Sequence, residues 1–356
     1  MSNPPPGFCK IRVKAFYNPA RRWYDSGMKI TLREVYAMAL TLESIQQAAE
    51  RIAPYTVRTP LLRLWNMDKF LGCEVYVKAE CMQITGAFKL RGAMNSALLL
   101  TEEERSRGIV AASSGNHGRA IAYTAKLLGT TAAIVMPYTA PRVKVEAIRA
   151  LGAEVVQCEV SERFRVAEEL CRERGAAMIP PFDDENVMAG QGTAGLEIAA
   201  QCPSLDTVIV PVSGGGLIGG VSTAIKGAAP HMRVYGAEPA ALPRYTASLA
   251  AGRIVRVEQK KSVADALVAQ MPGERCFPAV TAHVDGFAAV EDEYILRGMK
   301  LLLTEGKLLC EPSSAIGIGA VMQGLIEVRP TDKVCFLISG GSVGLEQLDM
   351  LKAVEI

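Results

Sequence analysis

The stretch Gly108-Ile-Val-Ala-Ala-Ser-Ser-Gly-Asn-His-Gly118 indicates the fold of this chain most clearly. Its first five residues are small or apolar, as in a buried strand, and the next six are small or polar. An amphipathic run of helical length, residues 119–128, follows directly. A strand, a polar loop and a helix in this order are typical of α/β folds, in which ligands bind beyond the carboxyl ends of the strands.

The same alternation of short apolar runs and helical stretches recurs along most of the chain. It predicts largely parallel sheets covered by helices. Strands are expected at residues 74–78, 108–112, 132–136, 154–157, 207–211, 233–236 and 333–338. Helices between them are expected at residues 119–128, 144–151 and 166–174.

Composition and charge limit the function classes. With 356 residues, of which 49% are hydrophobic and 21% charged, the chain fits a soluble α/β enzyme with one large domain or two lobes. The formal net charge of +2 gives no reason to expect nucleic acid or an anionic membrane as a partner. Apolar runs of about 18 residues, which a transmembrane helix needs, do not occur in the sequence.

The nine cysteines and three histidines argue against disulfides and zinc. The cysteines include no CxxC pair, and an odd count in a large chain without a secretory signal indicates reduced thiols in the cytoplasm. None of His117, His231 and His283 stands at metal-ligand spacing from another histidine or from a cysteine.

Residues 1–38 differ from the rest of the sequence. They contain Pro4-Pro5-Pro6 and Arg21-Arg22-Trp23, but neither a long apolar period nor the apolar core of a signal peptide. We interpret them as an N-terminal extension and a candidate disordered segment. The alternative is that Met38 is the initiator and that the extension reflects the choice of start site.

A lysine among apolar neighbours suggests a nucleophile. Lys89 stands in Thr85-Gly-Ala-Phe-Lys-Leu-Arg-Gly92, between an aromatic residue and a leucine. Desolvation by such neighbours lowers the pKa of an amine, which can then bind an aldehyde cofactor as a Schiff base. The alternative is a lysine at a helix start whose stem covers apolar neighbours.

Three polar loops follow expected strands. Residues 113–118 open a helix, so their backbone N–H groups could bind a carboxylate, although serine and asparagine also serve as plain helix caps. The consecutive glycines of Ser213-Gly-Gly-Gly-Leu217 could cradle a phosphate before a helix expected near Ile218. Ser339, after the last strand, is either a turn residue or a partner for a cofactor ring nitrogen.

The glycine loop also fits a dinucleotide site. Gly214, Gly216 and Gly219 spell G-x-G-x-x-G after a strand, and Glu238 ends a later strand. This pattern is close to the fingerprint of nicotinamide-dependent oxidoreductases. The motif alone does not decide between the two functions.

Taken in order, the lysine, the carboxylate loop, the glycine loop and the late serine resemble the fold-type-II pyridoxal-phosphate enzymes, and among them the serine/threonine dehydratases and serine racemases. The resemblance covers residues 41–348. It implies an α/β, two-lobed fold like that of the tryptophan synthase β subunit, with parallel sheets flanked by helices. Further motifs that carry it are Arg58-Thr-Pro-Leu61, Pro137-Tyr-Thr-Ala-Pro141, Ala189-Gly-Gln-Gly-Thr193 and Glu311-Pro312.

The resemblance implies pyridoxal 5'-phosphate as the cofactor and a role for each motif residue. Lys89 would hold the cofactor aldehyde and act as the base at the substrate Cα, with Phe88 beside the ring. Asn116 would bind the ring hydroxyl, and Ser339 the pyridine nitrogen. The residues expected at the cofactor phosphate are Ser213, Gly214, Gly215, Gly216 and Leu217, and those at the substrate carboxylate are Ser113, Ser114 and His117.

These roles imply β-elimination of water from a β-hydroxy amino acid such as L-threonine or L-serine, giving a 2-oxo acid and ammonia. A serine at the ring nitrogen does not favour a protonated ring, which favours loss of a β-leaving group over transamination. Racemisation stays an alternative, because serine racemases place a second acid/base at the position of Ser114. Phe182, in Pro181-Phe-Asp-Asp184, instead resembles the substrate pocket of dehydratases, since racemases carry an amide there.

Several positions depart from the family pattern. Ala266 replaces the glycine of the usual Ala-Asp-Gly, and Ala269 stands where racemases have a serine. A larger β-hydroxy amino acid is therefore a candidate substrate, and a cofactor-binding protein without turnover is a further alternative. Racemases bind a divalent cation with the residue matching Glu238 and an aspartate six residues later, which is Arg244 here. We expect Arg244 to pair with Glu238 and no metal to bind, the alternative being a solvated arginine.

The resemblance also implies how the chain is organised. A small mobile lobe is expected over residues 108–182, and a large cofactor-binding lobe over 39–107 and 183–356. Closure of the small lobe on the substrate would exclude water. The expected partners are a small-molecule amino-acid substrate and a second copy of the chain in a homodimer, and no regulatory domain is expected after Ser339.

Overall fold

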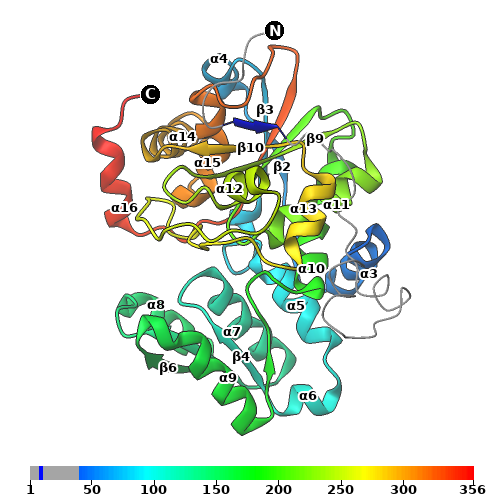
Figure 1. Cartoon of the computed structure of the whole chain (residues 1–356), viewed down its shortest axis with the longest axis vertical. Helices are drawn as coiled ribbons and strands as arrows, with labels where there is room; N and C mark the ends of the chain where they lie inside the picture. The colour runs from blue at the N-terminus through cyan, green and yellow to red at the C-terminus, as the bar shows by residue number, and fades with distance from the viewer. Residues whose placement is uncertain (1–7, 11–39) are drawn as a thin grey trace.

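The computed structural model describes residues 8–10 and 40–356, which form two sheets covered by helices (Figure 1). The larger sheet has the strand order β1-β10-β9-β8-β11-β3-β2. Its inner pairs are parallel, whereas the two edge pairs, β1 with β10 and β2 with β3, are antiparallel. The strands are β1 (Phe8–Lys10), β2 (Leu61–Arg63), β3 (Glu74–Ala79), β8 (Thr207–Pro211), β9 (Arg233–Pro239), β10 (Gly286–Val290) and β11 (Lys333–Ile338).

The smaller sheet has four parallel strands in the order β6-β5-β4-β7. Figure 1 shows it with α7, α8 and α9 in the lower half of the molecule. Its strands are β4 (Ile109–Ala112), β5 (Ala132–Pro137), β6 (Glu154–Cys158) and β7 (Ala177–Met178). The expected mobility of this part of the chain stays a prediction.

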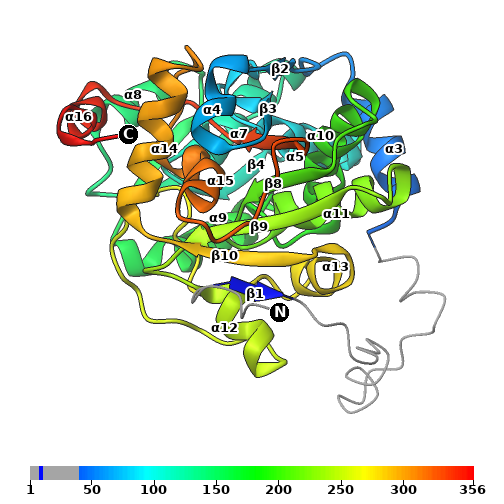
Figure 2. The ribbon, with the colours of Figure 1, turned by 90° about the horizontal axis from the view of Figure 1, so that it is seen from above.

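The helices cover both faces of the larger sheet. Figure 2 shows α14 and α15 on one side of the strands, and α10, α11 and α13 on the other. The α-helices are α3 (Leu42–Ile52), α4 (Asp68–Leu71), α5 (Lys89–Leu99), α6 (Glu102–Ser106), α7 (Asn116–Leu128), α8 (Arg142–Arg149), α9 (Arg163–Arg174), α10 (Glu185–Gln201), α11 (Gly216–Ala228), α12 (Arg244–Ala251), α13 (Cys276–His283), α14 (Asp292–Thr304), α15 (Pro312–Met322) and α16 (Leu345–Asp349). Short 3-10 helices are η1 (Trp65–Met67), η2 (Glu80–Met82), η3 (Val160–Glu162) and η4 (Met350–Ala353).

The expected α/β fold is confirmed, and all seven expected strands and three expected helices are present. Strand β10 was not expected because Gly286-Phe-Ala-Ala-Val290 has only one β-branched residue, and glycine and alanine are depleted in strands. Strands β2 and β7 are too short for a recognisable period. Strand β1 lies in the N-terminal extension and pairs with β10, whereas residues 1–7 and 11–38 of that extension lie outside the described residues.

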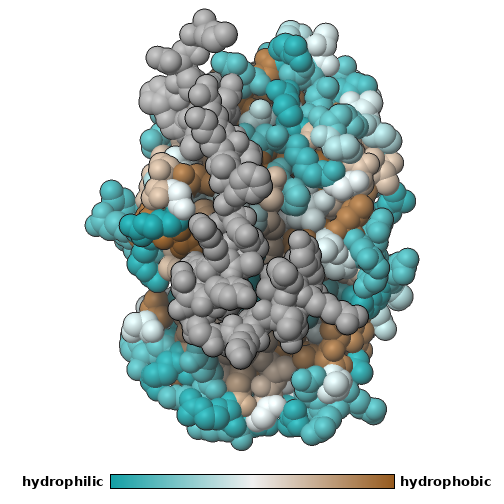
Figure 3. All heavy atoms as spheres, turned by 45° about the vertical axis from the view of Figure 1, so that its right-hand side comes forward, coloured by the Kyte–Doolittle hydropathy of each residue, from teal (hydrophilic) through white to brown (hydrophobic). Residues whose placement is uncertain are grey.

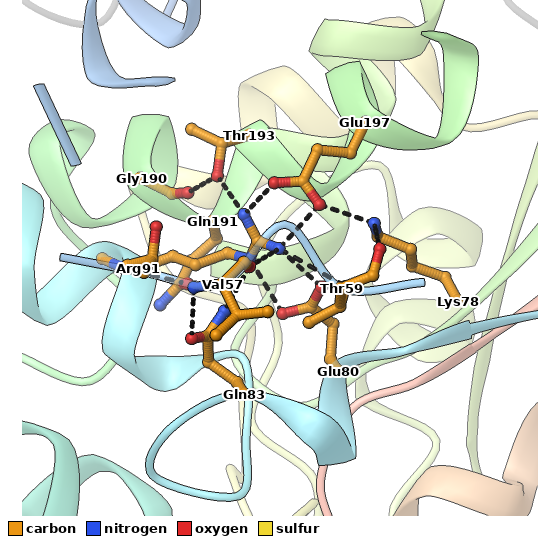
Figure 4. Close-up of polar contacts among 12 residues, drawn as sticks. Val57, Thr59, Lys78, Glu80, Gln83, Arg91, Gly190, Gln191, Thr193 and Glu197 are labelled. Carbon is orange, nitrogen blue, oxygen red and sulfur yellow. Dashed lines mark hydrogen bonds and ion pairs between the residues drawn. The ribbon is translucent and has the colours of Figure 1, made fainter. Parts of the chain in front are cut away.

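A buried cluster of charged side chains fixes the start of α5 against the larger sheet (Figure 4). The Arg91 guanidinium donates to both oxygens of Glu80 at 2.8 Å and to Glu197 at 2.7 and 2.9 Å. The Lys78 amine also donates to Glu197 and to the Thr59 carbonyl oxygen, the latter at 2.7 Å. Two cations and two carboxylates therefore balance one another, which is the condition for holding charges in the interior.

Within residues 8–10 and 40–356, no helix combines the length and the apolar character that crossing a bilayer requires. Figure 3 shows hydrophilic side chains over much of the described surface on one face, with apolar ones scattered among them. The cysteines at the eight positions from Cys73 to Cys335 form no disulfide.

Candidate active site

Lys89 is the first residue of α5. Its amine donates a hydrogen bond to the Pro181 carbonyl oxygen and lies 5.1 Å from the centre of the Phe88 ring. Burial lowers the pKa of this amine to about 8. The expected desolvation of Lys89 is therefore confirmed, and a larger fraction of the amine is neutral and nucleophilic near physiological pH than in an ordinary lysine.

The glycine loop, residues 213–217, follows β8, and its three consecutive glycines have no side chains to cover the backbone. Gly215 has a φ of +107°, which favours glycine, and a Cβ on this residue would overlap the Tyr245 hydroxyl. A Cβ on Gly214 would overlap the Phe182 ring, and one on Gly216 would lie 2.9 Å from the Phe182 Cα. Helix α11 begins at Gly216, so free backbone N–H groups and the positive end of a helix meet at this loop. This arrangement suits a phosphate.

We predict that Gly215→Ala weakens binding of pyridoxal phosphate at least about tenfold, which corresponds to about 1.4 kcal/mol. The substitution combines an unfavourable φ with the overlap on Tyr245, so the loop must shift. Gly252→Ala is the matched control, because Gly252 has a φ of +64° and open space around it. Titration of both apoproteins with pyridoxal phosphate measures the effect, and equal affinities for the two variants would contradict the assignment of the loop.

Asn116 and Glu311 form a second polar group at the site. The Asn116 amide donates to both carboxyl oxygens of Glu311, at 3.0 and 3.1 Å, and its oxygen accepts from the Ser342 hydroxyl at 2.6 Å. Burial raises the pKa of Glu311 to about 7, although the Asn116 hydrogen bond opposes this shift. Burial therefore favours the neutral form of Glu311 more than in an exposed glutamate, next to the side chain expected to bind the ring hydroxyl.

Ser339 lies at the end of β11 and is almost fully buried. Its hydroxyl is 2.9 Å from that of Ser314, which in turn accepts from the Gly340 N–H at 2.8 Å. Its carbonyl oxygen accepts from the Phe88 N–H at 3.0 Å, which ties the end of β11 to the residue before Lys89. The residue expected at the ring nitrogen thus belongs to a pair of neutral hydroxyls.

The carboxylate loop lies at the start of α7, which begins at Asn116. His117 points away from it: its Nε2 contacts the Ile179 carbonyl oxygen at 2.8 Å, and burial lowers its pKa to about 3. The buried His117 ring leaves its backbone N–H as the group that can bind a carboxylate, which narrows the expected role. Ser113 accepts from the Gly115 N–H at 3.3 Å, and the half-buried Ser114 hydroxyl bonds to no residue in the described part of the chain.

Hydrogen bonds and packing connect most of the expected residues. Pro181 touches the Lys89 amine, while the neighbouring Phe182 packs on the glycine loop. The Ser213 hydroxyl accepts from the Ala269 N–H at 3.2 Å. This bond joins the glycine loop to Ala269, one of the positions that depart from the family pattern. The expected role of Phe182 at the substrate stays a prediction, because in the structure its ring contacts the loop.

Three residues near the site had no assigned role in the sequence. Glu311 and Ser314 lie at the start of α15, and Tyr245 donates to the Gly214 carbonyl oxygen at 3.1 Å. The motif Glu311-Pro312 was a visible signal, because proline at the first position of a helix places the preceding residue at its cap. Nothing near Tyr245 in the sequence indicates that it reaches a loop 31 residues earlier.

Glu238 cannot serve a dinucleotide. It is completely buried, and its oxygens accept from the N–H groups of Tyr245 and Thr246 at 2.9 and 2.8 Å. A ribose hydroxyl therefore cannot reach the carboxylate that the dinucleotide fingerprint requires.

Comparison with known proteins decides the family. The sequence profile described as "Pyridoxal-phosphate dependent enzyme" matches residues 52–340. The chain belongs to this family. The alternative of a nicotinamide-dependent oxidoreductase is wrong. The motif Gly214–Gly219 is therefore not a dinucleotide fingerprint in this chain.

Both predicted activities occur among the relatives. A serine racemase of Oryza sativa is 39% identical over 318 residues, which cover 88% of this chain and 94% of that protein. An L-threonine ammonia-lyase of Thermotoga maritima is 40% identical over 314 residues, covering 88% and 78%. The solved structure of maize serine racemase superposes with a TM-score of 0.84 at 38% identity, covering 88% and 98%. Identities this close support the family and do not choose between the two reactions.

The residues present fit pyridoxal phosphate. Lys89 offers an amine with a lowered pKa, and residues 214–216 offer a backbone without side chains, since a Cβ on any of these three glycines would crowd Phe182 or Tyr245. Ser339 offers a hydroxyl that can donate or accept. The chain is therefore a pyridoxal-phosphate-dependent enzyme whose own residues can hold the cofactor at three points.

The residues present do not fit the divalent cation of the racemases. Arg244 is completely buried, and its guanidinium donates to the carbonyl oxygens of Val212 and Leu267, each at 2.9 Å. The predicted direct pairing of Arg244 with Glu238 is wrong, because the guanidinium uses those carbonyl oxygens and leaves its Nε without a partner in the described residues. The alternative of a solvated arginine is also wrong. A positive charge already occupies this part of the protein.

Proposed function

We propose that this enzyme eliminates water from a β-hydroxy amino acid and releases a 2-oxo acid and ammonia. When bound, pyridoxal phosphate supplies an aldehyde for the substrate amine and a ring that stabilises negative charge at Cα. The chain's residues supply binding, orientation and proton transfer. The hydroxyl leaves with a proton as water, and hydrolysis of the remaining enamine gives the 2-oxo acid and ammonia.

Each part of the site has a task in this reaction. Backbone N–H groups at the start of α7 would bind the substrate carboxylate, and those of residues 214–217 the cofactor phosphate. The Lys89 amine would take the Cα proton, since its lowered pKa keeps part of it neutral and able to act as a base at pH 7 to 8. Asn116 and Glu311 would bind the ring hydroxyl side of the cofactor.

The observation that carries the proposal is the neutral pair of Ser339 and Ser314. A hydroxyl does not keep the pyridine nitrogen protonated as a carboxylate does, so the ring would delocalise less of the negative charge from Cα. Prompt loss of a β-leaving group is then favoured over transamination. Phe182 supports the dehydratase assignment, because it places an apolar ring beside the site.

Racemisation is the second candidate function, and Ser114 favours it. Its hydroxyl is half-buried and bonds to no other described residue, so it is free to exchange a proton with a substrate. A racemase needs such a group on the face of Cα opposite Lys89. The two functions share every step up to loss of the Cα proton.

A screen of β-hydroxy amino acids tests the proposal. L-Threonine, L-serine and larger β-hydroxy amino acids, including those with a β-carboxylate, are incubated with the holoenzyme, and 2-oxo acid and ammonia are measured. We expect equal amounts of the two products from at least one substrate. Visible absorbance of bound cofactor without products from any of them would instead indicate a binding protein without turnover.

We also propose that the enzyme is a cytoplasmic homodimer whose partner is a second copy of the chain, with only small molecules as other ligands. Exposed apolar side chains such as Trp65 and Met82 offer surface for a copy to cover. Light scattering at several protein concentrations measures the mass, and a stable monomer would contradict the dimer.

A further inference from the structure

Arg244 connects two segments that meet at the phosphate loop. It is the first residue of α12, and its guanidinium binds Val212, directly before the loop, and Leu267, between Ala266 and Ala269. Both hydrogen bonds are 2.9 Å long and fully buried. A charged donor shared by two carbonyl oxygens holds them more strongly than a neutral donor would.

Glu238 completes the charge balance around Arg244. It is buried at the end of β9, and it binds the first turn of α12 through the N–H groups of Tyr245 and Thr246 and the Thr246 hydroxyl. Burial raises the pKa of Glu238, and the positive charge of Arg244 opposes this shift. The two charges thus stabilise each other through space rather than through a shared hydrogen bond.

The arrangement extends into the loop itself. Tyr245, next to Arg244, donates to the Gly214 carbonyl oxygen, and the Ser213 hydroxyl accepts from the Ala269 N–H. Two residues of α12 and one of the segment 264–269 therefore hold three consecutive positions, 212–214. A carboxylate and two carbonyl oxygens around one positive charge are also the kind of oxygen donors that a divalent cation uses.

We infer that Arg244 is a positioning residue that acts as a built-in cation: it holds the phosphate loop and the segment 264–269 together without a bound metal ion. Its positive charge attracts the carbonyl oxygens of Val212 and Leu267, as a divalent ion bound to the same two oxygens would. The inference rests on the assignment of residues 213–217 to the cofactor phosphate, which Gly215→Ala tests separately. It does not depend on whether the enzyme eliminates or racemises.

Cofactor affinity with and without divalent ions tests the inference. Apoprotein is titrated with pyridoxal phosphate in EDTA and in Mg²⁺ or Mn²⁺, and thermal midpoints of the apo and holo forms are recorded. For the unaltered protein we expect the same dissociation constant within about twofold, or 0.4 kcal/mol, under all conditions. A divalent ion that strengthens cofactor binding about tenfold would overturn the inference, and this arm needs no variant.

Three substitutions separate charge from packing. Arg244→Met should weaken cofactor binding at least about tenfold and narrow the gap between the holo and apo midpoints, and Arg244→Lys should lie between Met and the unaltered protein. Arg253→Met, at an exposed arginine just after α12, is the control. Arg244→Met with unchanged affinity, or with equal losses in the apo and holo midpoints, would show a packing role only and would overturn the inference.

Arg244→Asp gives the sharpest outcome. It places a second carboxylate near Glu238 and the two carbonyl oxygens, so we expect weak cofactor binding in EDTA and at least about fivefold tighter binding in Mg²⁺ or Mn²⁺. If Arg244→Asp folds but binds the cofactor equally well with and without divalent ions, the inference that Arg244 takes the place of a divalent ion would be contradicted.

Discussion

Lys89→Ala lowers kcat for 2-oxo acid formation at least about 10³-fold, because the substitution removes both the amine that binds the cofactor aldehyde and the base at Cα. Acid–base catalysis alone contributes about 10²- to 10⁴-fold. The fold should persist, since the Lys89 amine makes a single hydrogen bond to the described residues, to the Pro181 carbonyl oxygen. Steady-state assay of the purified variant after incubation with pyridoxal phosphate measures the effect.

Lys126→Ala is the matched control for this prediction. Lys126 is exposed on α7 and takes no part in the site, so its removal should leave kcat unchanged. Lys89→Ala should also lose the visible absorbance of covalently held cofactor. Borohydride reduction should then leave no cofactor permanently attached to the protein. Retention of most of the activity, or of a borohydride-stable label, would mean that another lysine holds the cofactor.

Arg91→Met should lower the free energy of unfolding by about 3–5 kcal/mol, a large loss for a single substitution. It leaves the fully buried Glu80 carboxylate with the Thr59 hydroxyl at 2.6 Å and with no positive side chain of the described residues in contact, and an uncompensated buried charge is costly. Because Arg91 lies two residues after Lys89, loss of its contacts should also loosen the start of α5 and weaken cofactor retention. Urea unfolding followed by circular dichroism, on apo and holo forms, measures both effects.

Two further variants identify the cause of the lost stability. The double variant Arg91→Met/Glu80→Gln removes the stranded charge, so it should recover part of the stability that Arg91→Met loses. Arg165→Met removes an arginine that pairs with Glu162 and Glu169 on the surface, and it should unfold close to the unaltered protein. Equal stability of Arg91→Met and Arg165→Met would contradict the role of the buried cluster.

The sequence predicted the alternating strands and helices because each strand has its own β-branched run and each helix its own apolar period. It could not predict which strands pair at the edges, since β1 and β2 are three residues long and pairing is a long-range property. Lys89, the glycine loop and Ser339 were each ambiguous alone, and they were assigned because their order along the chain resembles that of one enzyme family. Their mutual distances came only from the structure.

Contacts across long sequence separations explain the corrections. The sequence places His117 within the carboxylate loop, yet only the structure shows its ring turned to the Ile179 carbonyl oxygen. The resemblance suggested that Arg244 pairs with Glu238, because Arg244 stands where racemases carry an aspartate that binds the divalent cation. Carbonyl oxygens carry no sequence signal, so the contacts of Arg244 with Val212 and Leu267 could not be foreseen.

The partition of one substrate between two products tests the proposed function most directly. The best substrate of the screen is incubated with the holoenzyme, and 2-oxo acid and the inverted enantiomer are measured in the same samples over time. The apolar ring of Phe182, which resembles the substrate pocket of dehydratases rather than that of racemases, predicts that 2-oxo acid forms faster than the inverted enantiomer. Inversion that outpaces elimination, and that disappears in Ser114→Ala, would contradict the assignment as a dehydratase and establish a racemase.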